Sequence, residues 1–139
     1  MKAKGAAGSS FVVSLQIRDA HRRAEEISQG LGLKPDVAWD VGAQRLRPDG
    51  TPMSGKHAET YWGKTLESGA HAVPSALIEE CLLTLGARGG FIRKLAERGA
   101  RISFYVSWSV AVFPGDEFSP ELLQAVAGLG AGIAVEVFP

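Results

Sequence analysis

One short segment, residues 31–42, constrains the fold more than any other part of the chain. At its start, Gly32 can adopt the left-handed conformation that ends a helix, and Pro35 prevents the helix from resuming. Residues 36–42 then have the composition of a strand, with Trp39 in the middle. We interpret the segment as a helix end, a rigid turn and a strand, with Trp39 packed beneath the turn.

The spacing of apolar residues divides the rest of the chain. Alternation of apolar and polar residues indicates half-buried strands, and recurrence every three to four residues indicates amphipathic helices. Further strands are expected at 11–18, 59–66, 101–113 and 133–137. Helices are expected from the N-cap Asp19 to Leu31, from Pro74 to about Gly86, from Phe91 to Gly99, and from Pro120 after its N-cap Ser119. Residues 44–57 are expected to form the loop of a wide hairpin, and the Gly89-Gly90 pair to mark a break between helices.

The length of 139 residues corresponds to one domain. We expect residues 1–10, which are mostly small, to be a disordered tail, and residues 11–139 to form a single α+β domain. Strands with one apolar face suit a mostly antiparallel sheet with helices on that face only. The simplest architecture is a sheet of about five strands, ferredoxin-like with an added C-terminal helix and strand.

The charge balance argues against several classes of partner. Fifteen basic and fifteen acidic side chains cancel, whereas a protein that neutralises phosphates carries a basic excess, so we expect no nucleic-acid partner. No apolar run is long enough to cross a bilayer, so we expect no membrane partner. The single cysteine, Cys81, excludes an intramolecular disulfide and fits a reducing compartment. We therefore expect a cytoplasmic protein.

The residue types that carry catalysis or bind metals form no recognisable motif. His21, His57 and His71 lack the close spacing of zinc ligands. Cys81 lies on the apolar stripe of a predicted helix, where a thiol behaves as a small hydrophobic group. No serine lies in a nucleophile elbow, and the sequence contains no phosphate-binding loop. We predict no catalytic residue, no metal and no cofactor, and we favour a protein that is not an enzyme.

An enzymatic alternative would need an acid and a base. Asp40 and Glu59 could supply them across the predicted hairpin, although no spacing argument supports this pair.

The predicted hairpin is the stronger candidate for a binding site. Its loop carries Arg45, Arg47 and Lys56, with no acid other than Asp49, and Tyr61 lies on the strand that follows. Cations next to aromatic residues can bind a peptide, an acidic partner or a planar ligand, and loops of this length are usually functional or disordered. We expect Trp39 and Trp62 to be structural, because large aromatic residues usually anchor cores.

A second candidate is an anion site at the start of the first helix, where Arg22 and Arg23 lie close together. Helix N-termini bind anions. The competing interpretation is that Glu25 and Glu26, one turn further along, pair with Arg22 while Asp19 caps the helix.

The functional hypotheses follow in that order. The first is a protein-binding module that uses the hairpin, and a toxin-immunity role is one version of it without support from particular residues. The second is a small-molecule or anion-binding domain that uses the first-helix arginines. We expect either a monomer or a homodimer.

Several structural motifs resemble one known family, the bacterial domain of unknown function 4279. The motifs are the strand at 11–17, the helix end at 31–33, Pro35, Trp39 and Gly42, Trp62, and the closing Leu129-Gly130-Ala131. The resemblance extends from about Phe11 to Phe138. It implies an α+β fold and a bacterial source, and it transfers no activity and no functional residue.

Overall fold

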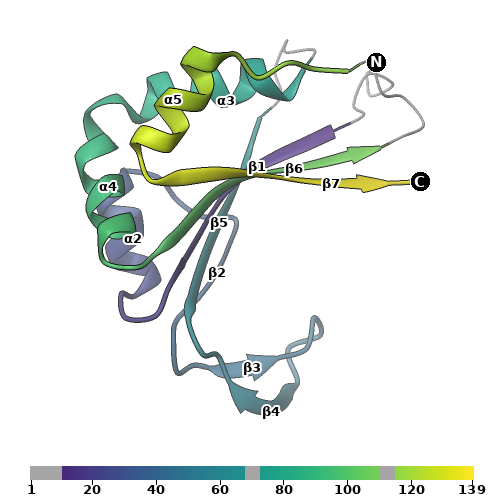
Figure 1. Ribbon diagram of the computed structural model, residues 1–139. Helices are drawn as coiled ribbons and strands as arrows, with labels where there is room; N and C mark the ends of the chain where they lie inside the picture. Colours follow the sequence, from purple (N-terminus) through teal and green to yellow (C-terminus); the bar gives the residue numbers. More distant parts are fainter. Residues whose placement is uncertain (1–10, 68–72, 110–114) are drawn as a thin grey trace.

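The computed structural model describes residues 11–67, 73–109 and 115–139 (Figure 1). The predicted tail 1–10, His71 and the end of the predicted strand 101–113 lie outside the described residues. The strands are β1 (Phe11–Asp19), β2 (Val37–Trp39), β3 (Gln44–Leu46), β4 (Pro52–Lys56), β5 (Thr60–Leu66), β6 (Arg101–Ser109) and β7 (Ala131–Phe138). The helices are α2 (Ala24–Leu31), α3 (Pro74–Leu85), the short 3-10 helix η1 (Gly86–Arg88), α4 (Gly89–Glu97) and α5 (Pro120–Gly128).

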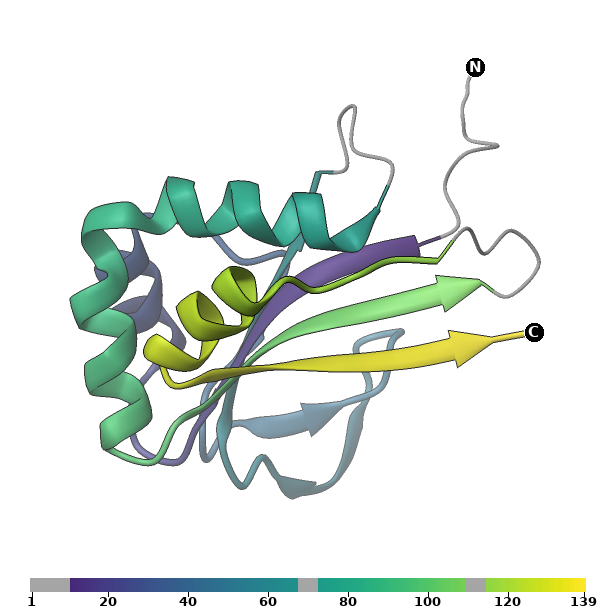
Figure 2. The ribbon, with the colours of Figure 1, turned by 45° about the horizontal axis from the view of Figure 1, so that its top comes forward.

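Five of these strands form one sheet in the order β2-β5-β1-β6-β7. All neighbouring pairs are antiparallel except β6 and β7, which run parallel because α5 returns the chain between them. The described helices lie on one side of the sheet (Figure 2), so the predicted α+β fold with a mostly antiparallel sheet is confirmed. The ferredoxin-like comparison stays a prediction.

The core lies between the sheet and its helices. Along β1 the residues Phe11, Val13, Leu15 and Ile17 are all buried, as their alternation predicts. The side chain of Trp62 is fully buried on the same side, and its indole N–H donates to the Ser28 hydroxyl at 2.9 Å. The structural role predicted for Trp62 is therefore confirmed. We call the other side of the sheet, away from the helices, the open face.

The first helix begins later than predicted, because Asp19 does not cap it. Asp19 ends β1, and its carboxylate accepts hydrogen bonds from the backbone N–H groups of His21 (2.8 Å) and Arg22 (3.0 Å). The chain therefore makes a turn before α2 starts at Ala24. The Ala24 N–H donates to the carboxylate of Asp40 at 2.8 Å, so a residue from beyond β2 satisfies the helix terminus.

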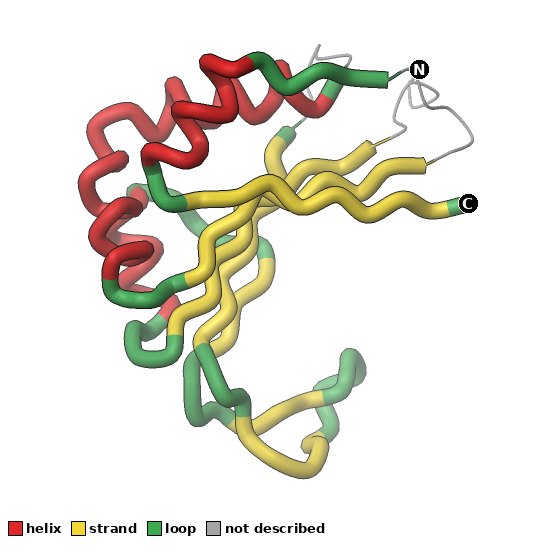
Figure 3. Tube along the Cα trace, in the orientation of Figure 1, coloured by secondary structure: helices red, strands yellow, loops and turns green. Residues whose placement is uncertain are grey.

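The predicted loop 44–57 contains two strands, which corrects the loop assignment. β3 and β4 pair with each other as a separate two-stranded sheet (Figure 3), with Gln44 opposite Lys56 and Leu46 opposite Pro52. The turn between them was recognisable from Gly50, which has a φ of +90°. The strands β3 and β4 could not be recognised from the sequence, because their side chains are nearly all exposed and show no apolar alternation.

The helix break also lies elsewhere than predicted. Gly89 and Gly90 are part of α4, and α3 passes into η1 at Gly86, where φ is +25°. A Cβ atom at Gly89 would lie 3.3 Å from a methyl carbon of Leu129, so close packing favours a glycine there. Among the described residues, no helix is both long and apolar enough to span a membrane.

Candidate functional site

A row of side chains crosses the open face where β2, β5 and β1 lie side by side. Trp39 pairs with Tyr61 in the β2–β5 ladder, and Tyr61 pairs with Arg18 in the β5–β1 ladder. Residues directly opposite each other on neighbouring strands point to the same face. The three side chains therefore line up beside one another on the open face.

The row forms a continuous stack that His57 extends. The Trp39 ring lies 4.4 Å from the His57 ring and 4.8 Å from the Tyr61 ring, measured between ring centroids. The Arg18 guanidinium lies 4.8 Å from the centroid of the Tyr61 ring, within the range of a cation–π contact. Partial burial in this stack raises the pKa of the Tyr61 phenol above its ordinary value, and the Arg18 charge opposes that rise.

This position corrects the prediction that Trp39 packs beneath the preceding turn. Trp39 is half-buried and lies outside the hydrophobic core, on the opposite side of the sheet from Trp62. Sequence reasoning also missed Arg18 and His57 as members of the stack. Arg18 was recognisable as a polar-face residue of its strand, but the strand order that places it beside Tyr61 was not.

The stack lies at the base of the β3–β4 hairpin. The N–H of His57 donates to the Ala43 carbonyl and the N–H of Gly42 donates to the His57 carbonyl, both at 2.9 Å. The hairpin extends from there away from the helices (Figure 3). His57 therefore connects the hairpin to the sheet through both its backbone and its ring.

The hairpin carries the three cations predicted for partner binding, and all three are exposed. The guanidinium groups of Arg45 and Arg47 donate to backbone carbonyls of the hairpin itself, those of Ser54 (3.4 Å) and Pro52 (3.0 Å). Within the described residues, neither these arginines nor Lys56 form an ion pair with a carboxylate. Their positive charge is therefore not neutralised by a contact in the described part of the chain.

Asp49, the one acidic residue of the hairpin loop, forms hydrogen bonds within the turn of the hairpin. The carboxylate of Asp49 accepts hydrogen bonds from the Thr51 N–H (3.0 Å) and the Thr51 hydroxyl (2.7 Å). These hydrogen bonds lower the pKa of Asp49 below its ordinary value. The acid stabilises the turn instead of pairing with the cations beside it.

A groove with a volume of ≈ 550 Å³ separates β2 from the hairpin. Trp39 and His57 line it on the side of the stack, and Arg45, Leu46 and Met53 line it on the side of the hairpin. The structure thus brings Arg45 and the aromatic base to one place. Tyr61 is not among the lining residues and contacts the groove only through Trp39.

The two arginines predicted to bind an anion are each ion-paired. An Arg22 guanidinium nitrogen lies 3.8 Å from the Glu26 carboxylate, and one of Arg23 lies 3.0 Å from the Asp40 carboxylate. The Arg22–Glu26 contact matches the competing interpretation, whereas the partner of Arg23, Asp40, comes from beyond β2 and was not anticipated. The anion site stays a prediction that the described geometry does not favour.

Asp40 and Glu59, the acid and base of the enzymatic alternative, each form ion pairs with arginines. Asp40 binds Arg23 and the Ala24 N–H. Glu59 forms ion pairs with both Arg101 (2.7 Å) and Arg18 (3.7 Å), which lie opposite each other in the β1–β6 ladder. Each carboxylate therefore serves as a counter-ion or cap in its own contact.

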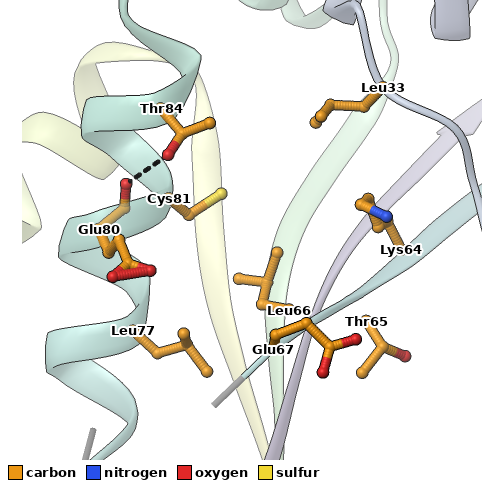
Figure 4. A pocket seen from close by; sticks show the side chains of 9 residues that line it. All are labelled: Leu33, Lys64, Thr65, Leu66, Glu67, Leu77, Glu80, Cys81 and Thr84. Atoms are coloured by element: carbon orange, nitrogen blue, oxygen red, sulfur yellow. Dashed lines mark hydrogen bonds between the residues drawn. The ribbon is translucent and has the colours of Figure 1, made fainter. Parts of the chain in front are cut away.

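A small apolar cavity of ≈ 160 Å³ lies between α3 and β5 (Figure 4). The sulfur of Cys81 points into it, opposite Leu33 and Leu66. Burial raises the pKa of the Cys81 thiol to about 11, and the Glu80 carboxylate contributes to the rise. The cysteine is buried, as predicted, and its thiol stays protonated at neutral pH, which does not suit a nucleophile.

Within the described ranges, no three His, Cys, Asp or Glu side chains lie together as metal ligands would. The fold and the site define a small α+β domain with a basic hairpin on an aromatic base. The chain belongs to the DUF4279 family, a domain of unknown function whose model matches residues 9–138, so the predicted resemblance is confirmed. No curated protein and no solved structure matches the chain.

Proposed function

We propose that this domain is a non-enzymatic module that binds another protein through the β3–β4 hairpin and its aromatic base. One observation carries the proposal. The hairpin presents Arg45, Arg47 and Lys56 to solvent, and none of the three has a carboxylate partner in the described structure. On the body of the domain Arg18, Arg22, Arg23 and Arg101 each have one, whereas Lys34, Lys94 and Arg98 have none among the described residues. The hairpin differs because its three cations share one loop whose single acid, Asp49, is bound by Thr51.

The surroundings of these cations support a protein as the partner. Interfaces combine aromatic residues, methionine and arginine at their centres, and the groove beside the hairpin contains Trp39, Met53 and Arg45. The stack of Trp39 between His57 and Tyr61 gives the hairpin a defined base. A preorganised surface loses less conformational entropy on binding than a free loop does.

The test is affinity capture from a lysate of the source organism with the immobilised domain. We expect at least one protein to be retained by the wild type and lost when Arg45, Arg47 and Lys56 are all replaced by alanine. Retention should also weaken as salt concentration rises, because exposed charges are screened. An unchanged set of retained proteins would rule out the proposed function.

A matched control separates the site from general charge loss. Replacing Lys34, Lys94 and Arg98 with alanine removes the same number of exposed cations from the body of the domain. This variant should retain the partner, and both variants should keep the wild-type unfolding midpoint within a few degrees, because exposed substitutions change stability by only about 0.5 kcal/mol.

A further inference from the structure

We propose that the groove between β2 and the hairpin binds an extended acidic segment of the partner protein, which joins the sheet as a strand next to β2. This inference rests on the proposed function and names the chemistry of the partner. It is carried by the free edge of β2, by the apolar lining of the groove and by its charge.

The groove lies beside the free edge of β2, as its lining residues and the strand order indicate. Ala38 and Trp39 both line it, although neighbouring residues of a strand point to opposite faces of a sheet. Contact with both places the groove beside the strand and not over one of its faces alone. β5 occupies one edge of β2, and no described strand pairs with the other. The groove is therefore next to a strand whose free edge offers backbone N–H and C=O groups to an added strand.

The lining of the groove suits apolar side chains from such a strand. The side chain of Leu46 is 55% exposed although it is large and apolar, and it lines the groove together with Met53 and the Trp39 indole. The volume of ≈ 550 Å³ falls within the range of small ligand sites. In an added strand, alternate side chains would enter this space while the others face solvent.

The charge of the groove selects an acidic segment. Arg45 lines it, and Arg47 and Lys56 are on the same hairpin without carboxylate partners in the described residues. Asp40 also lines the groove, but its carboxylate is held by Arg23 and the Ala24 N–H. Glutamate or aspartate side chains on the solvent side of a partner strand could form ion pairs with these hairpin cations.

A single-stranded nucleic acid is also acidic, but the site suits it less well. Recognition of unpaired bases depends on aromatic faces that are free to stack on them. Here the Trp39 ring already stacks against two other rings, those of His57 and Tyr61. The chain as a whole has no net charge, whereas nucleic-acid-binding domains usually have a basic excess.

The experiment uses a labelled probe peptide, Glu-Leu-Glu-Phe-Glu-Leu-Glu, and fluorescence anisotropy with the full chain. We expect saturable binding that weakens as salt rises. A peptide with lysine in place of every glutamate should bind at least about tenfold more weakly, because its charges repel the hairpin. Arg45→Ala with Lys56→Ala should weaken binding of the acidic probe by a similar factor, and Lys94→Ala with Arg98→Ala should leave it unchanged.

Backbone methylation of the probe tests the added strand directly. In a strand, the N–H groups of alternate residues point to one edge, so methylating the nitrogens of the glutamates and methylating those of the apolar residues block different edges. We expect one of these two methylated probes to bind like the parent and the other to lose about tenfold or more, since the one or two backbone hydrogen bonds that a three-residue strand can accept are removed and the methyl groups keep the strands apart.

Each result bears on a separate claim. Equal binding of both methylated probes would overturn strand addition, and equal binding of the lysine peptide would overturn the acidic partner. Failure of the acidic probe to bind at all would overturn the inference, and so would tighter binding of a ten-nucleotide oligo-dT. None of these results affects the lysate experiment, which alone decides the proposed function. Selective probe binding with an unchanged set of lysate partners would leave the site standing and remove that function.

Discussion

Trp39 stacks on His57 with ring centroids 4.4 Å apart, and this contact joins the last residue of β2 to the residue that follows β4. His57 also exchanges backbone hydrogen bonds with the chain leading into β3. Ring and backbone therefore act together where the hairpin leaves the sheet. The hairpin has no buried core of its own, so its position depends on this junction.

Replacing His57 with alanine tests that dependence. Removing one ring from an aromatic pair costs about 0.5–1.5 kcal/mol, so we expect a small loss of global stability in urea unfolding. Because the lost contact lies at the junction, amide hydrogen exchange should quicken mainly across residues 42–57. His57→Phe should restore slow exchange, and His21→Ala, at an exposed histidine, should change neither measurement. Unaltered exchange in the hairpin of His57→Ala would show that the backbone alone holds it.

The hydrogen bond between Trp62 and Ser28 ties α2 to the sheet. Ser28→Ala leaves a fully buried indole N–H without its acceptor, and an unsatisfied buried donor costs about 1–3 kcal/mol. In Ser28→Ala with Trp62→Phe, the donor and acceptor are both gone, although the smaller ring leaves a cavity. A double-mutant cycle by urea unfolding should give a coupling energy above about 0.5 kcal/mol. A coupling near zero would mean that water replaces the serine.

The core and its elements were predictable because they depend on local patterns. Alternation along β1 identified the buried face, and Ser119 capped α5 as expected, with its hydroxyl accepting from the Leu122 N–H at 3.1 Å. The site was only partly predictable. Arg45, Arg47 and Lys56 stand out as cations in one loop, but their lack of carboxylate partners depends on which acids the fold brings near.

The stack illustrates what local patterns miss. Trp39, Tyr61 and Arg18 meet because β5 lies between β2 and β1, and that order is set by chain crossovers between distant segments. Residue type favoured a core position for Trp39, since large aromatic residues are usually buried. The register of the three-residue strand β2 instead places Trp39 on the open face, and a shift by one residue would have exchanged the two faces of the strand.

The raised pKa of Cys81 predicts a loss of stability in alkali. The thiol pKa is about 11 in the folded protein against a reference of 9.0, so the folded state holds the proton more strongly than the unfolded state does. The protonated thiol therefore stabilises the folded state. This stabilisation is fully present below about pH 9 and is lost as the pH rises to about 11. A difference of this size corresponds to at most about 2–3 kcal/mol.

The measurement compares the wild type with Cys81→Ala, which keeps a small apolar side chain. The free energy of unfolding of the wild type relative to the variant should fall between about pH 9 and pH 11, and it should be constant at lower pH. Reaction of the native protein with iodoacetamide at pH 7.5 should be slow, and unfolding should speed it. Rapid native alkylation would contradict a buried, protonated thiol.

The arginines of the alternative anion site give a fourth test. Arg22 and Arg23 already lie next to Glu26 and Asp40, so a phosphate ion would compete with existing carboxylates. We expect phosphate to change the thermal unfolding midpoint no more than chloride does at equal ionic strength, in the wild type and in Arg22→Ala with Arg23→Ala alike. A rise specific to phosphate that the double variant loses would establish the anion site instead.

Asp40 combines two roles that different substitutions can separate. Its carboxylate accepts from the Ala24 N–H at 2.8 Å and pairs with Arg23 at 3.0 Å. Asp40→Ala removes both, and loss of a cap costs about 0.5–2 kcal/mol, so unfolding should shift to lower urea. Asp40→Asn keeps an acceptor for the N–H and loses the charge, and an exposed ion pair contributes at most about 1 kcal/mol. We therefore expect the asparagine variant to recover most of the lost stability. Equal losses in the two variants would mean that the ion pair, and not the cap, holds the start of α2 to the chain that leads into the hairpin.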